Sequence, residues 1–320
     1  MDMKIAIMES LGIPGETLQR HMAPFIAAGH TFAVYERTTE TDALIEEACD
    51  ADIMLLANMP MPGYIIDRCP LLKFIDVAFT GVDHVGLEAA KRRNIAVSNA
   101  SGYSTQAVSE LALGMALSLI RHVPELETCC RSGENPSGII GREICGKTIG
   151  IIGCGKIGLR SAELFHALGA HILAQSRSYH KDFPTYIEQV DQEDLLRRSD
   201  IVLLHCPLND STRGIINRDT LSLMKPTSLL INVARGPIVV EKDLADALNS
   251  GCIAGAGIDV FDQEPPLEAD NPLLNSKNIL VTPHVAFATK ESMLLRADIV
   301  FANLKAWMDG RQQNIVLAGV

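Results

Sequence analysis

The stretch from residue 146 to residue 177 constrains the fold more than any other part of the chain. Residues 148–152 form a short apolar run typical of a buried strand, followed at once by the glycine pattern Gly153-Cys154-Gly155-Lys156-Ile157-Gly158. Apolar residues then recur at helical spacing, Gly169 ends that helix, and residues 171–174 resume as a second strand. Strand, glycine turn, helix and strand within about thirty residues is the context in which G-x-G-x-x-G predicts a dinucleotide site.

The three glycines have different physical roles in such a site. Gly153 permits the tight turn, Gly155 lets the backbone approach a pyrophosphate, and Gly158 lets helix and strand pack closely. The helix beginning at Lys156 and Ile157 offers free N–H groups and partial positive charge to the phosphates. The alternative is that these glycines serve only turn and packing in an ordinary βαβ unit.

Composition narrows the class of protein. A chain of 320 residues suits two domains, and none of its apolar runs is long enough to span a bilayer. A net charge of −11 without a basic block argues against nucleic acid or an anionic membrane as the partner. The eight cysteines form no C-x-x-C pair, and the N-terminus lacks a signal-peptide pattern. We therefore expect a cytoplasmic protein with reduced thiols and no metal site.

The first hundred residues alternate strand and helix patterns, which predicts a parallel sheet with helices on both faces. We expect strands at 4–8, 31–35, 52–57, 73–78 and 95–98, with helices at 16–28, 41–49 and 85–93. No fingerprint glycine turn occurs here, so this half is expected to bind substrate. After its fourth strand, Gly81 and Val82 can present backbone N–H groups to an anion. An ordinary turn is the alternative at that loop.

A long amphipathic helix is predicted at 103–122, ended by Pro124 and followed by a polar connection over 125–145. Beyond the glycine unit, strands and helices alternate again. The strands are expected at 201–204, 228–232, 254–258 and 279–281, and the helices at 192–198, 218–224, 242–249 and 290–308. The fold class is therefore α/β, with two doubly wound parallel-sheet domains of Rossmann-like or flavodoxin-like type.

Three polar residues that follow strands in the second half could perform chemistry. Arg235 carries a planar fork suited to a carboxylate and a neighbouring carbonyl oxygen. His284 is the residue type best suited to move a proton near neutral pH, and Glu264 could hydrogen-bond its imidazole. Each has an ordinary alternative as a surface ion pair, a satisfied polar group or a solvated carboxylate. Together they supply an anion clamp, a proton donor and its orienting group, which hydride transfer to a 2-oxo acid requires.

Several sequence blocks occur in an order that resembles one family through nearly the whole chain. They are the glycine pattern at 153–158, His205-Cys206-Pro207-Leu208, Asn232-Val233-Ala234-Arg235-Gly236, Gly257-Ile258-Asp259-Val260-Phe261, Glu264-Pro265 and Thr282-Pro283-His284. The chain is similar to the D-isomer-specific 2-hydroxyacid dehydrogenases.

The resemblance implies an NAD(P)-dependent enzyme that moves a hydride between the cofactor and a small 2-oxo or D-2-hydroxy acid, such as glyoxylate or hydroxypyruvate. It implies Arg235, Glu264 and His284 as catalytic residues, with Arg235 and the Gly81 and Val82 amides on the substrate carboxylate. It also implies a site in the interdomain cleft and a homodimer joined through the dinucleotide domains. The substrate domain is expected at 1–102 and 286–320, around a dinucleotide domain at 103–285. The expected cofactor contacts are Gly153, Gly155, Lys156, Ile157, Gly158, Ser176, Arg177, His205, Pro207, Thr212, Val233, Ala234, Asp259 and Thr105.

The second dinucleotide strand departs from the pattern of NAD-using members. Those carry an acidic residue at the end of this strand, where it holds the ribose hydroxyls, whereas this chain has Ser176 followed by Arg177. A serine and an arginine can bind a 2′-phosphate that a carboxylate would repel, and His180 and Lys181 follow closely. We therefore predict that NADP is preferred and that NAD remains possible. A second departure, Phe287 in place of glycine, predicts a narrowed substrate pocket.

Other functions remain open at this stage. A dinucleotide-sensing protein similar to the corepressors of this fold would bind cofactor without turnover. Those proteins carry additional interaction segments, which we do not expect here because the chain stops soon after its last helix. A phosphoglycerate dehydrogenase-like enzyme is a further alternative, and Glu264 disfavours a formate enzyme. The pocket for the substrate side chain is expected from residues 58–61, Tyr103 and Phe287.

Overall fold

A computed structural model describes residues 2–135 and 138–319. The chain divides into two compact units, one formed by Met1–Ser104 with Ala288–Val320 and the other by Thr105–Phe287. The extreme ends of the predicted substrate domain, residues 1 and 320, lie outside the described part. Each unit contains one sheet with helices packed on it, so the predicted α/β fold class is confirmed.

The sheet of the second unit has the strand order β12-β11-β10-β9-β6-β7-β8, and all its pairings are parallel. The first strand of this unit, β6, lies inside the sheet, and the chain adds β7 and β8 on one side of it. It then crosses back and adds β9 to β12 on the opposite side of β6. That reversal is the switch point of a Rossmann-type sheet, beside which such folds bind dinucleotides. The strands are β6 (Thr148–Ile152), β7 (His171–Gln175), β8 (Ile187–Gln189), β9 (Ile201–Leu204), β10 (Leu229–Asn232), β11 (Gly255–Ile258) and β12 (Ile279–Val281).

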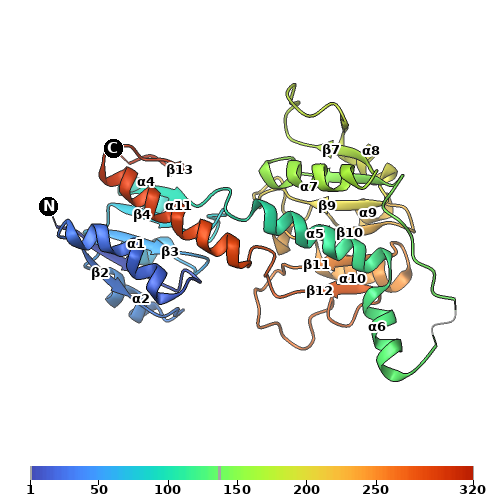
Figure 1. The fold of residues 1–320 in the computed structure, drawn as a ribbon, viewed down its shortest axis with the longest axis horizontal. Coiled ribbons are helices and arrows are strands. Elements are labelled where there is room, and N and C mark those ends of the chain that lie inside the picture. Colours follow the sequence, from blue (N-terminus) through green and yellow to red (C-terminus); the bar gives the residue numbers. More distant parts are fainter. Residues whose placement is uncertain (1, 136–137, 320) are drawn as a thin grey trace. The chain divides into compact units, whose positions relative to one another are not determined.

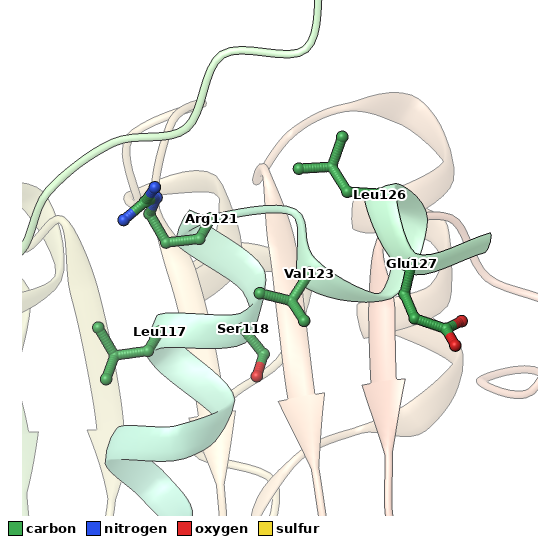
Figure 2. A pocket seen from close by; sticks show the side chains of 6 residues that line it. All are labelled: Leu117, Ser118, Arg121, Val123, Leu126 and Glu127. Atoms are coloured by element: carbon green, nitrogen blue, oxygen red, sulfur yellow. The ribbon is translucent and has the colours of Figure 1, made fainter. Parts of the chain in front are cut away.

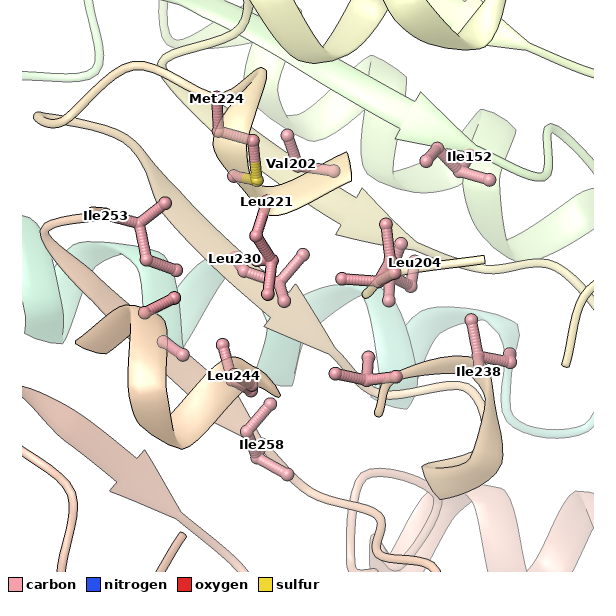
Figure 3. Packing of buried hydrophobic residues seen from close by; sticks show 14 of the residues in the cluster. Ile152, Val202, Leu204, Leu221, Met224, Leu230, Ile238, Leu244, Ile253 and Ile258 are labelled. Atoms are coloured by element: carbon pink, nitrogen blue, oxygen red, sulfur yellow. The ribbon is translucent and has the colours of Figure 1, made fainter. Parts of the chain in front are cut away.

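Both faces of this sheet are covered, and alternate residues of each strand pack into opposite cores. In β9, Ile201 and Leu203 belong to a cluster with residues of α5 and α7. Val202 and Leu204 belong to a second cluster, with residues of α8, α9 and α10, and Figure 3 shows this second cluster. Burial on both faces explains why β9 is uniformly apolar. The helices of this unit are α5 (Thr105–Ile120), α6 (Val123–Ser132), α7 (Lys156–Ala167), α8 (Gln192–Arg198), α9 (Arg218–Ser222) and α10 (Glu241–Ser250).

The first unit has the strand order β13-β5-β4-β3-β1-β2. Its five parallel strands follow the flavodoxin-like order 2-1-3-4-5, and β13 adds an antiparallel edge. The strands are β1 (Lys4–Ile7), β2 (Thr31–Val34), β3 (Ile53–Leu56), β4 (Phe74–Val77), β5 (Ala96–Asn99) and β13 (Ile315–Leu317). The helices are α1 (Gly15–Ala27), α2 (Thr41–Ala48), α3 (Gly63–Ile66), α4 (Leu87–Arg92) and α11 (Lys290–Met308). Aromatic contacts hold α11 to this unit, including Phe301 with Phe25 and Trp307 stacked on Phe74 at 4.8 Å.

The predicted polar connection over 125–145 was wrong at its start, where residues 125–132 belong to α6, and its residues 136 and 137 lie outside the described part. Pro124 does not simply end the preceding helix, because it lies in the first turn of α6. Proline is tolerated there since its missing N–H would have no intrahelical partner. His122, with a left-handed φ of 53°, forms the corner between α5 and α6. The short elements α3, β8 and β13 were also not predicted.

Candidate active site

The glycine turn lies between β6 and α7, and its geometry fits a bound pyrophosphate. Gly153 has a φ of 95°, and a Cβ there would lie 2.4 Å from the backbone nitrogen of Cys206. A Cβ on Gly158 would lie 2.3 Å from the carbonyl oxygen of Gly153, so this glycine is required for packing. By contrast, among the described residues other than its own chain neighbours, none comes within 4 Å of a Cβ placed on Gly155. The open space above Gly155, at the N-terminus of the twelve-residue α7, leaves room for a phosphate.

Ser176 and Arg177 follow directly after β7. Ser176 Oγ donates to the carbonyl oxygen of Ser178 at 2.8 Å, and Gln189 holds the backbone of His180 from both sides. The side chains of Arg177 and Lys181 are exposed and have no hydrogen-bond or ion-pair partner among the residues described. This loop therefore presents two cations and a hydroxyl directly after the second strand of the glycine unit.

His205 follows β9, beside the glycine turn, and its imidazole Nε2 lies 2.9 Å from Oγ of the fully buried Ser161 on α7. Burial lowers the pKa of His205 to about 4, so the ring is neutral at physiological pH. The loop after it is closed by Thr212, whose hydroxyl donates to the carbonyl oxygen of Pro207 at 2.6 Å. Sequence reasoning selected His205 and missed Ser161, whose signal is an inward-facing serine one turn after the last fingerprint glycine.

The three proposed catalytic residues all belong to the second unit. Glu264 Oε2 lies 2.7 Å from Nδ1 of His284, so the structure brings these two predicted residues within hydrogen-bonding distance. The His284 side chain is mostly buried and that of Glu264 is half exposed. His284 also meets the ring of Phe287 edge-on, with centroids 5.6 Å apart. The contact with Phe287 narrows the space beside the imidazole.

Asp259, at the end of β11, fixes the loop that carries His284. Its carboxylate accepts from Thr282 Oγ1 at 2.5 Å and from the backbone N–H groups of Val285 and Ala286 at 2.9 Å each. Its carbonyl oxygen accepts from the backbone N–H of His284 at 2.7 Å, where the histidine has a left-handed φ of 54°. Burial raises the pKa of Asp259, against these hydrogen bonds. The structure thus shows Asp259 holding this loop, and its contact with the cofactor stays a prediction.

Arg235 follows β10, which pairs with β11 in the same sheet. The side-chain oxygen of Asn232 accepts from the N–H of Ala234 at 3.1 Å, and its nitrogen donates to the carbonyl oxygen of Arg235 at 2.9 Å. A Cβ on Gly236 would lie 1.9 Å from the carbonyl carbon of Phe261, so the loop bearing Arg235 packs on the loop after β11. Arg235 and His284 therefore stand at the carboxyl edge of one sheet. Of the other residues predicted to contact the cofactor, Val233 is buried, Lys156 is the first residue of α7 and Thr105 is the first residue of α5.

Gly81 and Val82 lie in the first unit, after β4. Among the residues that the structure describes, no acceptor is bonded to either backbone N–H group. Both residues are partly exposed, and the preceding carbonyl oxygen of Thr80 is held by Asn99 Nδ2 at 2.7 Å. Two adjacent backbone N–H groups without an acceptor, on a loop held in place, can donate hydrogen bonds to a bound anion.

Comparison with known proteins agrees with this arrangement. Residues 113–286 match the family described as D-isomer specific 2-hydroxyacid dehydrogenase, NAD binding domain. A hydroxypyruvate reductase of Blautia hydrogenotrophica is 37% identical over 296 residues, covering 88% of this chain and 91% of the relative. The chain belongs to this family. It is thus an oxidoreductase that transfers a hydride between a nicotinamide dinucleotide and a 2-oxo or 2-hydroxy acid.

One further relative and two solved structures are also similar to this chain. A glyoxylate reductase of Thermofilum pendens is 37% identical, covering 84% of this chain and 82% of the relative. An acyclic imino acid reductase solved with NADPH and D-Arg superposes with a TM-score of 0.89 at 28% identity, covering 98% of this chain and 100% of that one. A D-lactate dehydrogenase of Aquifex aeolicus solved with NAD and lactic acid gives 0.86 at 25% identity, covering 96% of each chain. Among the residues described here, no helix has the length and apolar character needed to cross a membrane.

Proposed function

We propose that the protein is an NADP(H)-preferring reductase of small 2-oxo acids such as glyoxylate or hydroxypyruvate, forming the D-2-hydroxy acid. The observation that carries the proposal is the 2.7 Å pair of His284 and Glu264 at the same sheet edge as Arg235. In this proposal the unit containing Gly81 and Val82 binds substrate, and the unit containing the glycine turn binds the dinucleotide.

The proposed roles follow from the chemistry of each group. Arg235 binds the substrate carboxylate and polarises the ketone oxygen, while the free N–H groups of Gly81 and Val82 hold the carboxylate. When bound, the dihydronicotinamide supplies the hydride to the carbonyl carbon. His284 donates a proton from Nε2 to the carbonyl oxygen, because Nδ1 faces Glu264. The carboxylate of Glu264 orients the ring by accepting a hydrogen bond from Nδ1.

The NADP preference rests on the loop after β7. The free cations of Arg177 and Lys181 and the hydroxyl of Ser176 suit a 2′-phosphate, whereas they give the two ribose hydroxyls of NAD no carboxylate acceptor. Replacing Ser176 with an acidic residue should weaken the preference for NADPH over NADH. We expect Ser176→Asp to lower the preference for NADPH over NADH by about tenfold or more, from repulsion of the phosphate. Ser222→Asp, which adds the same charge at an exposed site on α9, should leave the ratio unchanged.

The deciding assay follows dihydronicotinamide absorbance with a panel of 2-oxo acids, with NADPH and NADH in parallel. Turnover with NADPH over NADH supports the proposal and ranks the acids. His284→Gln should reduce kcat by about a hundredfold or more with the NADPH Kd kept. Near-normal rates in that variant would remove the acid/base role. Tight cofactor binding without turnover of any acid would favour a sensor.

We further propose a homodimer formed through the second unit. A groove between α5 and α6 exposes apolar side chains (Figure 2), lined by Leu117, Ser118, Arg121, Val123, Leu126 and Glu127. Leu117 is 39% exposed and Val123 is 50% exposed, which is unfavourable for a face left in water. Val123→Asp should shift the sedimentation coefficient to that of a monomer. Leu168→Asp, at an exposed leucine just after α7, should not.

The redox state of the cysteines indicates the cellular compartment of the protein. All eight are free thiols, and burial raises the pKa of Cys154 to about 12 and of Cys206 to about 11. We propose a cytoplasmic location, because free thiols persist in a reducing compartment. Fractionation of cells expressing the tagged chain tests it, with recovery outside the cytoplasm as the contrary outcome.

A further inference from the structure

Glu9 is a buried carboxylate to which no sequence motif assigns a role. It stands two residues beyond β1 and is 5% exposed. Its Oε1 accepts from the backbone N–H groups of Ala57 at 2.8 Å and Met59 at 2.7 Å, both just beyond β3. Since β1 and β3 are adjacent parallel strands, Glu9 ties together the carboxyl ends that flank the switch point of the first sheet.

The second oxygen of Glu9 is paired with Arg37, which follows β2. Arg37 Nη1 lies 2.7 Å from Glu9 Oε2 and 2.6 Å from Asn58 Oδ1. The Arg37 side chain is 46% exposed, so it compensates the buried charge from the solvent side. The loop of residues 57–59 is thus held by two backbone hydrogen bonds and one side-chain hydrogen bond, all traced to this ion pair.

That loop is joined in turn to the one carrying the free amides. The N–H of Met61 donates to the carbonyl oxygen of His84 at 2.9 Å, and the N–H of Gly86 donates to the carbonyl oxygen of Met61 at 2.9 Å. A Cβ on Gly86 would lie 2.4 Å from the nitrogen of Gly63, so these segments touch backbone to backbone. Met61 therefore links the loop of residues 57–61 to residues 84–86 through two backbone hydrogen bonds.

We propose that Glu9, with Arg37, is a positioning residue for substrate binding, which fixes loop 57–61 and through it the Gly81 and Val82 amides. The inference rests on the proposed function, because it assigns those amides to the substrate carboxylate. It predicts a defect in substrate affinity, because the dinucleotide turn lies in the other unit. An anchor needed only for folding would lower stability without this selectivity.

A matched control lies at the opposite, amino-terminal ends of the strands of the same sheet. Asp52, just before β3, accepts from the backbone N–H of Lys4 at 3.0 Å and from Lys73 Nζ at 2.7 Å. Asp52 and Lys73 thus repeat the arrangement of a carboxylate, a backbone donor and a half-exposed cation. This second pair lies at the amino ends of the strands, away from residues 57–61 and 81–86.

The experiment compares Glu9→Ala, Glu9→Gln and Arg37→Met with Asp52→Asn and Lys73→Met. Each purified protein is assayed for kcat and KM with the best 2-oxo acid and titrated with NADPH by fluorescence. We expect Glu9→Ala to raise KM by about tenfold or more, because misplacing a binding loop by about 1 Å has effects of this size. Glu9→Gln keeps a neutral acceptor for both N–H groups and should be milder, as should Arg37→Met. The control variants should change KM by less than about twofold, and NADPH Kd should be constant throughout.

Amide hydrogen exchange gives a readout that does not depend on turnover. Glu9→Ala should accelerate exchange in peptides covering 57–61 and 81–86, and Asp52→Asn should not. An unchanged KM in the Glu9 variants, or equal KM effects in the Asp52 controls, would overturn this inference while leaving the proposed function intact. A wild-type protein that reduces no 2-oxo acid would overturn both.

Discussion

Asp76 offers a quantitative test of how the first unit is held together. It lies in the middle of β4 and is fully buried. Its Oδ1 accepts from Asn303 Nδ2 on α11 at 3.0 Å, and its Oδ2 has no hydrogen-bond partner among the described residues. Burial raises the pKa of Asp76 to about 8, although the bond from Asn303 acts in the opposite direction. At neutral pH this carboxyl group is therefore protonated in the folded protein.

The raised pKa makes stability depend on pH in a defined direction. Below about pH 4 the group is protonated in both folded and unfolded chains, so it has no effect. Between about 4 and 8 the unfolded chain releases the proton and the folded protein keeps it, so the free energy of unfolding falls as pH rises. The slope is about 1.4 kcal/mol per pH unit, which gives a loss of about 4 kcal/mol at pH 7 relative to pH 4.

Asp76→Asn removes this titration with little change in shape. The amide oxygen can still accept from Asn303, while its NH2 group has no evident partner and costs about 1–3 kcal/mol at every pH. We expect the variant to be no more stable than wild type at pH 4.5 and more stable by about 2–4 kcal/mol at pH 7.5. The two stability curves should cross between about pH 4.5 and pH 6.

Urea unfolding followed by tryptophan fluorescence suits this test, because Trp307 is the only tryptophan and stacks on Phe74 of the same strand. Midpoints and slopes would be measured from pH 4.5 to 8.5. Asp67→Asn, at a half-exposed aspartate of the same unit, controls for the substitution and should change stability by less than about 0.5 kcal/mol. Parallel pH curves for wild type and Asp76→Asn would refute the assignment of a buried proton.

Three further outcomes are expected. Gly155→Ala should weaken NADPH binding at least about tenfold without changing thermal stability, because the added Cβ enters the open space left for the phosphate. Gly158→Ala should lower both the NADPH affinity and the thermal stability, because the added Cβ meets the backbone of Gly153. Isothermal titration and thermal melts separate the two, and equal effects would contradict the phosphate site. Glu264→Gln should lower kcat by about tenfold to a hundredfold at constant NADPH Kd in stopped-flow and steady-state assays. Ser161→Ala should lower the free energy of unfolding by about 1 kcal/mol in urea, and no loss would mean that the contact with His205 contributes nothing.

The sequence alone was sufficient for the dinucleotide unit's main features. Strands such as β9 are uniformly apolar because both faces are buried, and the glycine turn has a spacing that few other structures require. The sequence also placed Arg235 and His284 after strands of one parallel sheet, whose carboxyl ends must lie at a common edge. Local pattern and chain direction were enough for these predictions.

Elements that depend on a distant partner were not predictable. The three-residue strands β8 and β13 exist because β7 and β5 offer them backbone partners, and three residues carry no readable period. In the sequence, Pro124 is compatible both with the end of one helix and with the first turn of the next. Only the structure, in which His122 has a left-handed conformation between α5 and α6, distinguishes the two.

The tertiary structure also decided what the polar residues do. The sequence cannot show that Asp259 holds the loop of His284, or that Glu9 reaches Ala57 and Met59 nearly fifty residues away. A carboxylate near a strand end is solvated by default, and it becomes an anchor only where folding brings free N–H groups to it and removes water. The sequence therefore determined which groups are available at the sheet edge, and long-range packing determined which of them are held in place.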